Sequence, residues 1–145
     1  MAMLFAAKTH RIAIGHGRHD ASVAAAAALF DAWTETGNIA TMVSWPADAA
    51  SWLRPARHLA VEHPDACVIA DTPAGTAQLT ARLVECDGWS PARTFGFASV
   101  AGPELILLTG SSLVGMTGTT SDGGGWLIRE DDLLVEDRRP KAVHR

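Results

Sequence analysis

The chain has 145 residues, 48% of them hydrophobic and 19% charged, and its formal net charge is −4. This length favours a single domain that can bury a core without a disulfide or a metal. The acidic balance makes nucleic acid a poor partner, because that affinity comes from Lys and Arg neutralising phosphates. No apolar run is long enough to span a membrane.

The first predicted unit is a buried strand, a glycine-bearing loop and an alanine-rich helix. Residues 11–15 carry alternating β-branched residues and predict a strand. Apolar residues recur at three- and four-residue steps over 21–36 and predict an amphipathic helix. Asp20 is expected to cap its N-terminus, and Gly37 to end it in a left-handed conformation.

Two more strand–helix units and a fourth strand follow. The predicted strands span 39–45, 66–70 and 94–99, and the apolar run at 66–70 suits a strand covered on both faces. A helix is expected over 47–62, either kinked at Pro55 or starting there. Thr72 is a candidate cap for the next helix, with Pro73 at its first position.

The pattern of residues changes after Ser99, where short apolar runs alternate with Gly, Ser and Asp. These runs are too close together for helices between them, so they predict antiparallel or edge strands at 105–109, 113–117, 126–129 and 133–136. A loop is expected at 117–125, and the tip of the last hairpin at 130–132. The alternation before them indicates a parallel sheet. We therefore expect a three-layer α/β domain of the Rossmann or flavodoxin-like class, with a core over 10–100, a β-rich extension over 101–137 and a tail over 138–145.

Residues 64–100 resemble the C-terminal lobe of LacI-type regulators and type 1 periplasmic binding proteins. The resemblance rests on an apolar strand ending Ile69-Ala70-Asp71, the helix pattern from Gly75 to Leu83, the turn at Trp89-Ser90-Pro91 and the strand end at Gly96-Phe97. It implies a lobe that binds a small polar molecule. The acidic pair usual after that last strand is replaced by Ala98-Ser99, and a lone lobe would supply only half a cleft.

Ligands of open parallel sheets bind at the carboxyl ends of the strands. That rule gathers a set of candidate ligand-binding residues: His16, Gly17, Arg18, His19, Asp20, Trp45, Asp71, Thr72 and Ser99. The glycines and Arg18 could cradle an anion at a helix N-terminus. The alternative is a tight turn in which the glycines only lead into a helix capped by Asp20.

Two other functions remain open on the same residues. The chain could be a small enzyme using His16, His19 and Asp71, or a scaffold domain without a site. The histidines and carboxylates lack the spacing of a metal site, and neither dinucleotide nor Walker motif is present, so we expect no metal and no cofactor. His58 and His63 are expected to face solvent.

Cellular location and assembly are predicted from weaker signals. Cys67 and Cys86 are read as buried free thiols. Residues 1–7 are apolar but too short for a signal peptide, which favours the cytoplasm. A lone lobe with five tryptophans and apolar strands near a sheet edge favours a homodimer. A monomer is the alternative if the C-terminal strands cover the domain's own sheet.

Overall fold

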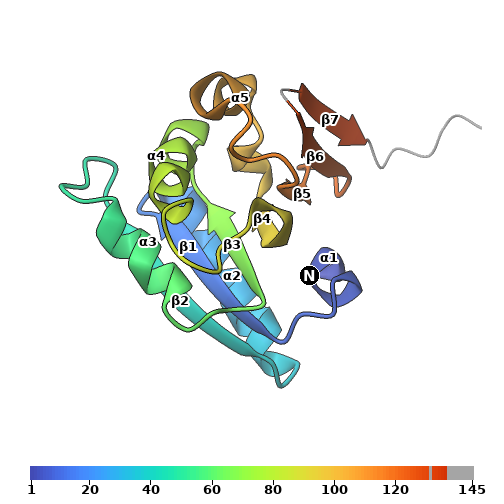
Figure 1. The fold of residues 1–145 in the computed structure, drawn as a ribbon. Coiled ribbons are helices and arrows are strands. Elements are labelled where there is room, and N and C mark those ends of the chain that lie inside the picture. Colours follow the sequence, from blue (N-terminus) through green and yellow to red (C-terminus); the bar gives the residue numbers. More distant parts are fainter. Residues whose placement is uncertain (131, 137–145) are drawn as a thin grey trace, which may run out of the picture.

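One mixed sheet runs through the computed structural model, which describes residues 1–130 and 132–136 (Figure 1). The strands are β1 (Arg11–Gly17), β2 (Ile39–Trp45), β3 (Ala66–Ala70), β4 (Thr94–Gly96), β5 (Thr117–Thr119), β6 (Gly125–Arg129) and β7 (Asp132–Glu136). They lie in the order β2-β1-β3-β4-β5-β6-β7. Neighbours from β2 to β5 are parallel, while β6 and β7 are antiparallel.

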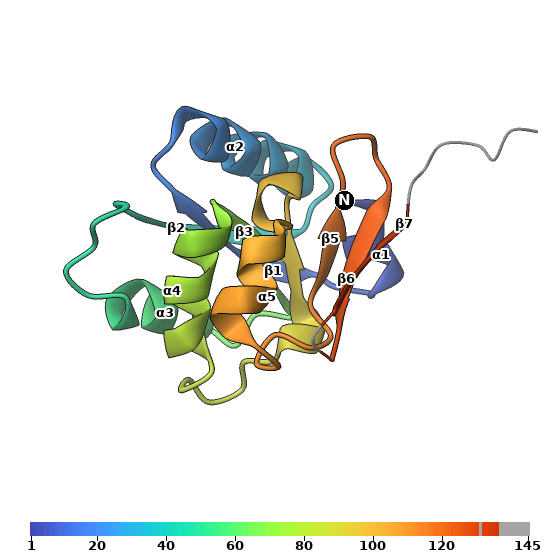
Figure 2. The same ribbon diagram turned by 90° about the horizontal axis from the view of Figure 1, so that it is seen from above.

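Helices cover both faces of the sheet, which gives the expected three layers (Figure 2). One face carries α1 (Ala2–Ala6) and α2 (Asp20–Glu35), and the other carries α3 (Leu53–Ala60), α4 (Pro73–Leu83) and α5 (Pro103–Thr109). Short 3-10 helices occupy Pro91–Arg93 and Ala98–Val100. The predicted α/β class is confirmed. Among the described helices, none combines the length and apolar character needed to cross a membrane.

Strand β1 contributes side chains to both hydrophobic cores, because successive side chains of a strand point to opposite faces of the sheet. Ile12 and Ile14 are fully buried in the cluster under α2, whereas Ala13 belongs to the cluster under α3, α4 and α5. Burial on both faces explains why the central strands are continuously apolar.

Two tryptophans lie across glycines on the α3–α5 face of the sheet. The indole of Trp45 from β2 covers Gly15 of the neighbouring β1, where an added Cβ would lie 2.7 Å from the ring. The indole of Trp126 from β6 covers Gly118 of β5 and reaches Gly96 of β4. Glycine is therefore required at these strand positions because a neighbouring ring fills the space of a side chain.

The capping predictions divide into two confirmed and one wrong. The Thr72 hydroxyl accepts a hydrogen bond from the Gly75 N–H at 3.1 Å and caps α4, and Gly37 follows α2 with a φ of +85°. Asp20 does not cap α2: His19 is the N-cap, and Asp20 is the first helical residue. Strand β1 runs on to Gly17, two residues beyond its predicted end, and α2 begins at Asp20, one residue before its predicted start.

Helix α3 begins at Leu53, so Pro55 falls in its first turn. The first four N–H groups of a helix have no partner within it, which lets proline stand there without a kink.

The region after Ser99 differs most from the prediction. Residues 105–109 form helix α5 instead of a strand, and 113–116 form turns that lead into β5. Because β4 and β5 are parallel, the chain must cross over the sheet between them, and a helix makes that connection. Pro103 at its first position and Glu104 in its first turn start α5.

The remaining strands of that region are confirmed. Residues 120–124 connect β5 to β6 as a hairpin, so the predicted loop over 117–125 is wrong at its first three residues, which form β5. Glu130, with a φ of +48°, begins the turn between β6 and β7. Position 131 of that turn and the predicted tail over 138–145 lie outside the described residues.

Asp65 ties the start of β1 to the loop before β3. Its Oδ2 accepts hydrogen bonds from the backbone N–H groups of His10 and Arg11, both at 2.9 Å. These two bonds favour the charged carboxylate and lower the pKa of Asp65 below its ordinary value of 3.8.

Asp65→Asn is expected to lower stability near neutral pH, with the deficit shrinking as the medium is acidified. The folded-state pKa of Asp65 lies below 3.8, so its contribution is present above that value and is lost as pH falls through the folded pKa. Urea unfolding at pH 7, 5 and 3 measures the deficit. A deficit that stays constant over that range would contradict the assignment.

Gly15→Ala is expected to lower the free energy of unfolding by about 1–3 kcal/mol, the usual cost of overpacking. The new methyl would meet Trp45 and Leu59. Trp45→Phe should therefore cost less in the Gly15→Ala background than in the native chain. Gly118→Ala provides the contrast, because its methyl would meet the Gly96 carbonyl oxygen, and a smaller ring at Trp126 should not rescue it. Additive costs of Gly15→Ala and Trp45→Phe would contradict this packing.

Candidate functional site

The carboxyl edge of β1, β2 and β3 gathers most of the predicted site residues. Gly17 lies beside Trp45, and His16 lies beside Ala70, the residue before Asp71. Ser99 follows β4 in the 3-10 helix Ala98–Val100. Helices α2 and α4 both begin at this edge. The topology thus brings the candidates from four strands to one side of the sheet.

The candidates divide into a buried and an exposed group. His16, Gly17, Trp45 and Asp71 are buried, and Asp71 is only 2% exposed. Arg18, His19, Asp20, Thr72 and Ser99 are exposed. Only the second group is open to a ligand from solvent, and the first group supports it from below.

Asp71 is the centre of the buried group. Its Oδ2 accepts a hydrogen bond from Trp45 Nε1 at 2.7 Å, and its Oδ1 accepts one from the Thr72 N–H at 2.7 Å. His19 Nε2 lies 3.5 Å from Oδ1. A buried carboxylate needs such donors, because desolvation otherwise disfavours its charged form. Asp71 therefore connects β2, the start of α4 and the loop before α2.

Two glycines make room for this carboxylate. A Cβ on Gly17 would lie 2.5 Å from Asp71 Oδ1, and one on Gly75 would overlap Oδ2. The prediction named Gly17 but missed Gly75. Glycine weakens a helix interior, so Gly75 in the first turn of α4 was a signal of close approach that the sequence offered.

Trp52 was also not among the predicted site residues. Its ring lies 6.3 Å from that of Trp45, at an interplanar angle of 60°. Trp45, predicted to lie near a ligand, is 1% exposed, with its ring between Gly15 and Trp52 and its N–H bonded to Asp71.

The three residues of the enzyme hypothesis are not joined into a relay in the described structure. His16 Nδ1 hydrogen-bonds to the Gly17 carbonyl at 2.7 Å, which makes Nδ1 the donor. No described contact links His16 to His19 or Asp71. His19 and Asp71 do form a pair, but the two carboxylate oxygens already accept bonds from Trp45 and Thr72.

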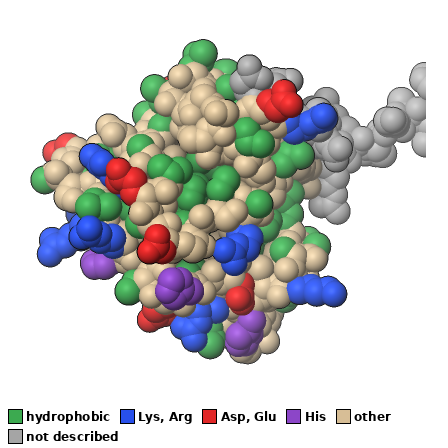
Figure 3. Space-filling view, viewed as in Figure 1, with side chains coloured by type: hydrophobic (Ala, Val, Ile, Leu, Met, Phe, Trp, Pro, Cys, Tyr) green, Lys and Arg blue, Asp and Glu red, His purple; other side chains and the backbone are tan. Residues whose placement is uncertain are grey.

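Among the residues that the structure describes, no group of three or more His, Cys, Asp or Glu side chains is placed to hold a metal ion. Charges of both signs are interspersed over the face in Figure 3, without one dominant field. The described surface has several hollows. One is an apolar gap of about 370 Å³ between α1, α2 and the sheet, and another is a depression at the amino end of β3.

Comparison with known proteins gives a likeness in structure alone. No protein-family model matches the chain, and no curated protein matches its sequence. A leucine-binding protein from Thermotoga maritima is 23% identical with a TM-score of 0.69, over 82% of this chain and 35% of that one. A branched-chain amino acid ABC transporter protein from Rhodospirillum rubrum is 18% identical with a TM-score of 0.72, over 83% and 34%.

An extracellular ligand-binding receptor from Rhodopseudomonas palustris is 14% identical with a TM-score of 0.73, over 85% of this chain and 33% of the receptor. The chain thus spans about a third of the length of these structures. Identities this low establish the fold and no more. The expected likeness to periplasmic binding proteins is confirmed at the level of fold, and the finer resemblance to LacI-type regulators stays a prediction.

Proposed function

We propose that the chain is a small-molecule binding lobe whose polar contacts come from the exposed residues at the carboxyl edge. The observation that carries the proposal is that Arg18, His19, Thr72 and Ser99 are exposed along the edge where the buried Asp71 already accepts hydrogen bonds from Trp45 and Thr72. A rigid base under exposed polar groups preorganises a site, which reduces the ordering cost of binding.

Charge and polarity at this edge favour a small polar ligand. Arg18 forms no ion pair with any described carboxylate, so its guanidinium is available for an acidic group of a ligand. Thr72 and Ser99 add hydroxyls, and His19 adds a ring already oriented by Asp71. The similar structures include proteins named for leucine and branched-chain amino acids. Amino acids are therefore the first class to test.

The exposed residues of one chain would form only one wall of a ligand cleft. We propose that a second copy of the chain supplies the other, so that two polar edges enclose one ligand. In a two-fold pair the same residues would face each other across the ligand. This arrangement links ligand binding to association, and the two can be measured separately.

An amino acid, sugar or nucleoside that binds at this edge is expected to raise the melting temperature, because binding to the native state stabilises it. Arg18→Ala and His19→Ala should each weaken the response at least ten-fold in ligand concentration. Arg82→Ala is the matched control, because Arg82 lies in the last turn of α4, at the end away from the carboxyl edge, and pairs there with Glu85. Thermal-shift titration measures all four proteins. A response that both edge variants retain in full would contradict the proposed site.

Sedimentation is expected to show a dimer at micromolar concentration, strengthened by any ligand found in the screen. Arg18→Ala should remove the strengthening while leaving the fold intact. A single species near 15.3 kDa with and without ligand would rule out the shared cleft.

A further inference from the structure

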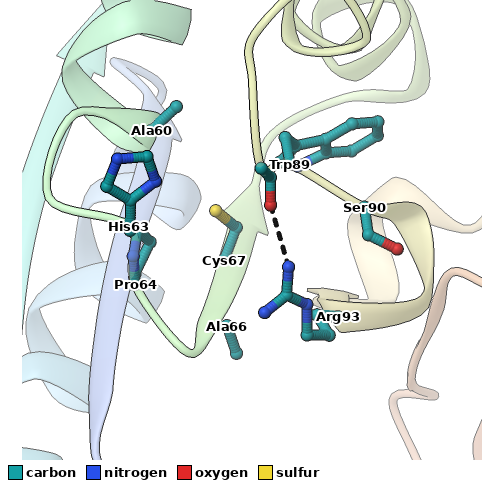
Figure 4. Close-up of a pocket in the computed structure, with 9 residues that line it drawn as sticks. Ala60, His63, Pro64, Ala66, Cys67, Trp89, Ser90 and Arg93 are labelled. Carbon is teal, nitrogen blue, oxygen red and sulfur yellow. Dashed lines mark hydrogen bonds between the residues drawn. The ribbon is translucent and has the colours of Figure 1, made fainter.

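A depression at the amino end of β3, the edge opposite the proposed ligand site, brings a histidine and an arginine together (Figure 4). Its volume is about 280 Å³ when the open solvent at its mouth is counted, but only about 20 Å³ of this is enclosed space that a water-sized group can occupy. The imidazole of His63 lies on one side of the Cys67 thiol and the guanidinium of Arg93 on the other, while the ring of Trp89 extends away from them.

Gly88 contacts both the Arg93 and the His63 side chains. Arg93 Nη2 donates a hydrogen bond to the Gly88 carbonyl at 2.8 Å. A Cβ on Gly88 would lie 3.1 Å from His63 Nδ1, so the imidazole packs against this residue where a larger one would crowd it. Gly88 has a φ of +81° and His63 a φ of +47°, which means that both loops adopt backbone conformations uncommon for most residues.

Both groups have donors to spare. A guanidinium carries five N–H donors, and within the described chain Arg93 uses one of them and pairs with no carboxylate. Arg11 and Arg82, by contrast, pair with Glu62 and Glu85. The ring of His63 makes no hydrogen bond to any described residue. A neutral imidazole still offers one N–H, so the depression presents donors whichever form His63 adopts.

No carboxylate side chain lines the depression itself. Burial raises the pKa of the Cys67 thiol to about 12, so the sulfur is uncharged at physiological pH. The neighbouring carboxylates do not line the depression itself: Glu62 pairs with Arg11, Asp87 lines an adjoining hollow that shares His63, and Asp65 lines one that shares Arg93. Asp65 is moreover directed toward the N–H groups of His10 and Arg11.

We propose that this depression binds a small oxyanion, a carboxylate or a phosphate, held by the fork of Arg93 and the ring N–H of His63. A planar guanidinium matches two oxygens of either group. The enclosed space admits only about one oxygen, so most of the bound group, a free anion or the terminal carboxylate or phosphate of a longer molecule, lies at the open mouth, where Arg93 is exposed. The site is separate from the one proposed at the carboxyl edge and does not depend on it.

Titration with acetate and with inorganic phosphate, at constant ionic strength set with chloride, tests the site by amide NMR. We expect saturable shifts at Gly88 and Trp89 for at least one anion, and the anion that saturates first identifies the source. Arg93→Met keeps the apolar stem and should weaken binding at least ten-fold. His63→Asn should also weaken it, and asparagine tolerates the positive φ at this position.

Arg82→Met removes an equivalent exposed charge elsewhere and should leave the shifts unchanged. Arg18→Ala should also leave them unchanged, which separates this site from the carboxyl edge. Shifts that rise linearly without saturation for both anions would overturn the proposal. Binding that persists undiminished in both Arg93→Met and His63→Asn would overturn it as well. If one of these two variants does not fold, the other decides.

Discussion

The hydrogen bond from the indole of Trp45 to the carboxylate of Asp71 organises the carboxyl edge of the sheet. It is buried and 2.7 Å long, and it spans from the end of β2 to the residue after β3. The ring can make this span only because β1, which lies between them, has Gly15 beneath it. Loss of either partner would leave a buried polar group unsatisfied, which costs about 1–3 kcal/mol.

This hydrogen bond distinguishes residues that hold the edge together from residues that could contact a ligand. Trp45 and Asp71 use their polar atoms on each other, and Asp71 also fixes the Thr72 N–H at the start of α4. His19, held near the same carboxylate, keeps about half of its side chain exposed, at 49%. The exposed polar groups therefore lie beside buried residues that already have hydrogen-bond partners without a ligand.

The sequence predicted the parallel part of the fold well because its signals there are local. Strand β3 is one apolar run, Thr72 and Pro73 mark a helix start, and Gly37 marks a helix end. It failed at α5, where the apolar run Leu105–Leu108 fits a strand or a helix equally. The pairing of β4 with β5, which decides between them, is a contact between distant segments.

The position of the candidate residues in the fold was predictable, but their burial was not. The rule on strand ends selected residues that the structure does place along one edge of the sheet, yet it did not distinguish the buried Trp45 from the exposed Arg18. Only the fold reveals that the ring of Trp45 turns inward over Gly15, while Arg18 faces solvent. The sequence contained no sign of the depression near Arg93, because His63 comes from the loop before β3 and Arg93 from the 3-10 helix before β4, and the two meet only at Gly88.

The tryptophans lying over glycines also constrain how this sequence can change over generations. At the first pair, the order of substitutions matters: Trp45 must become smaller before Gly15 can gain a side chain, so the reverse path passes through an overpacked intermediate. At Gly118 neither order works, because a carbonyl oxygen of β4 blocks the position as well as the ring. Descendants of this chain should therefore vary together at positions 15 and 45, and should retain glycine at 118 whatever residue replaces Trp126.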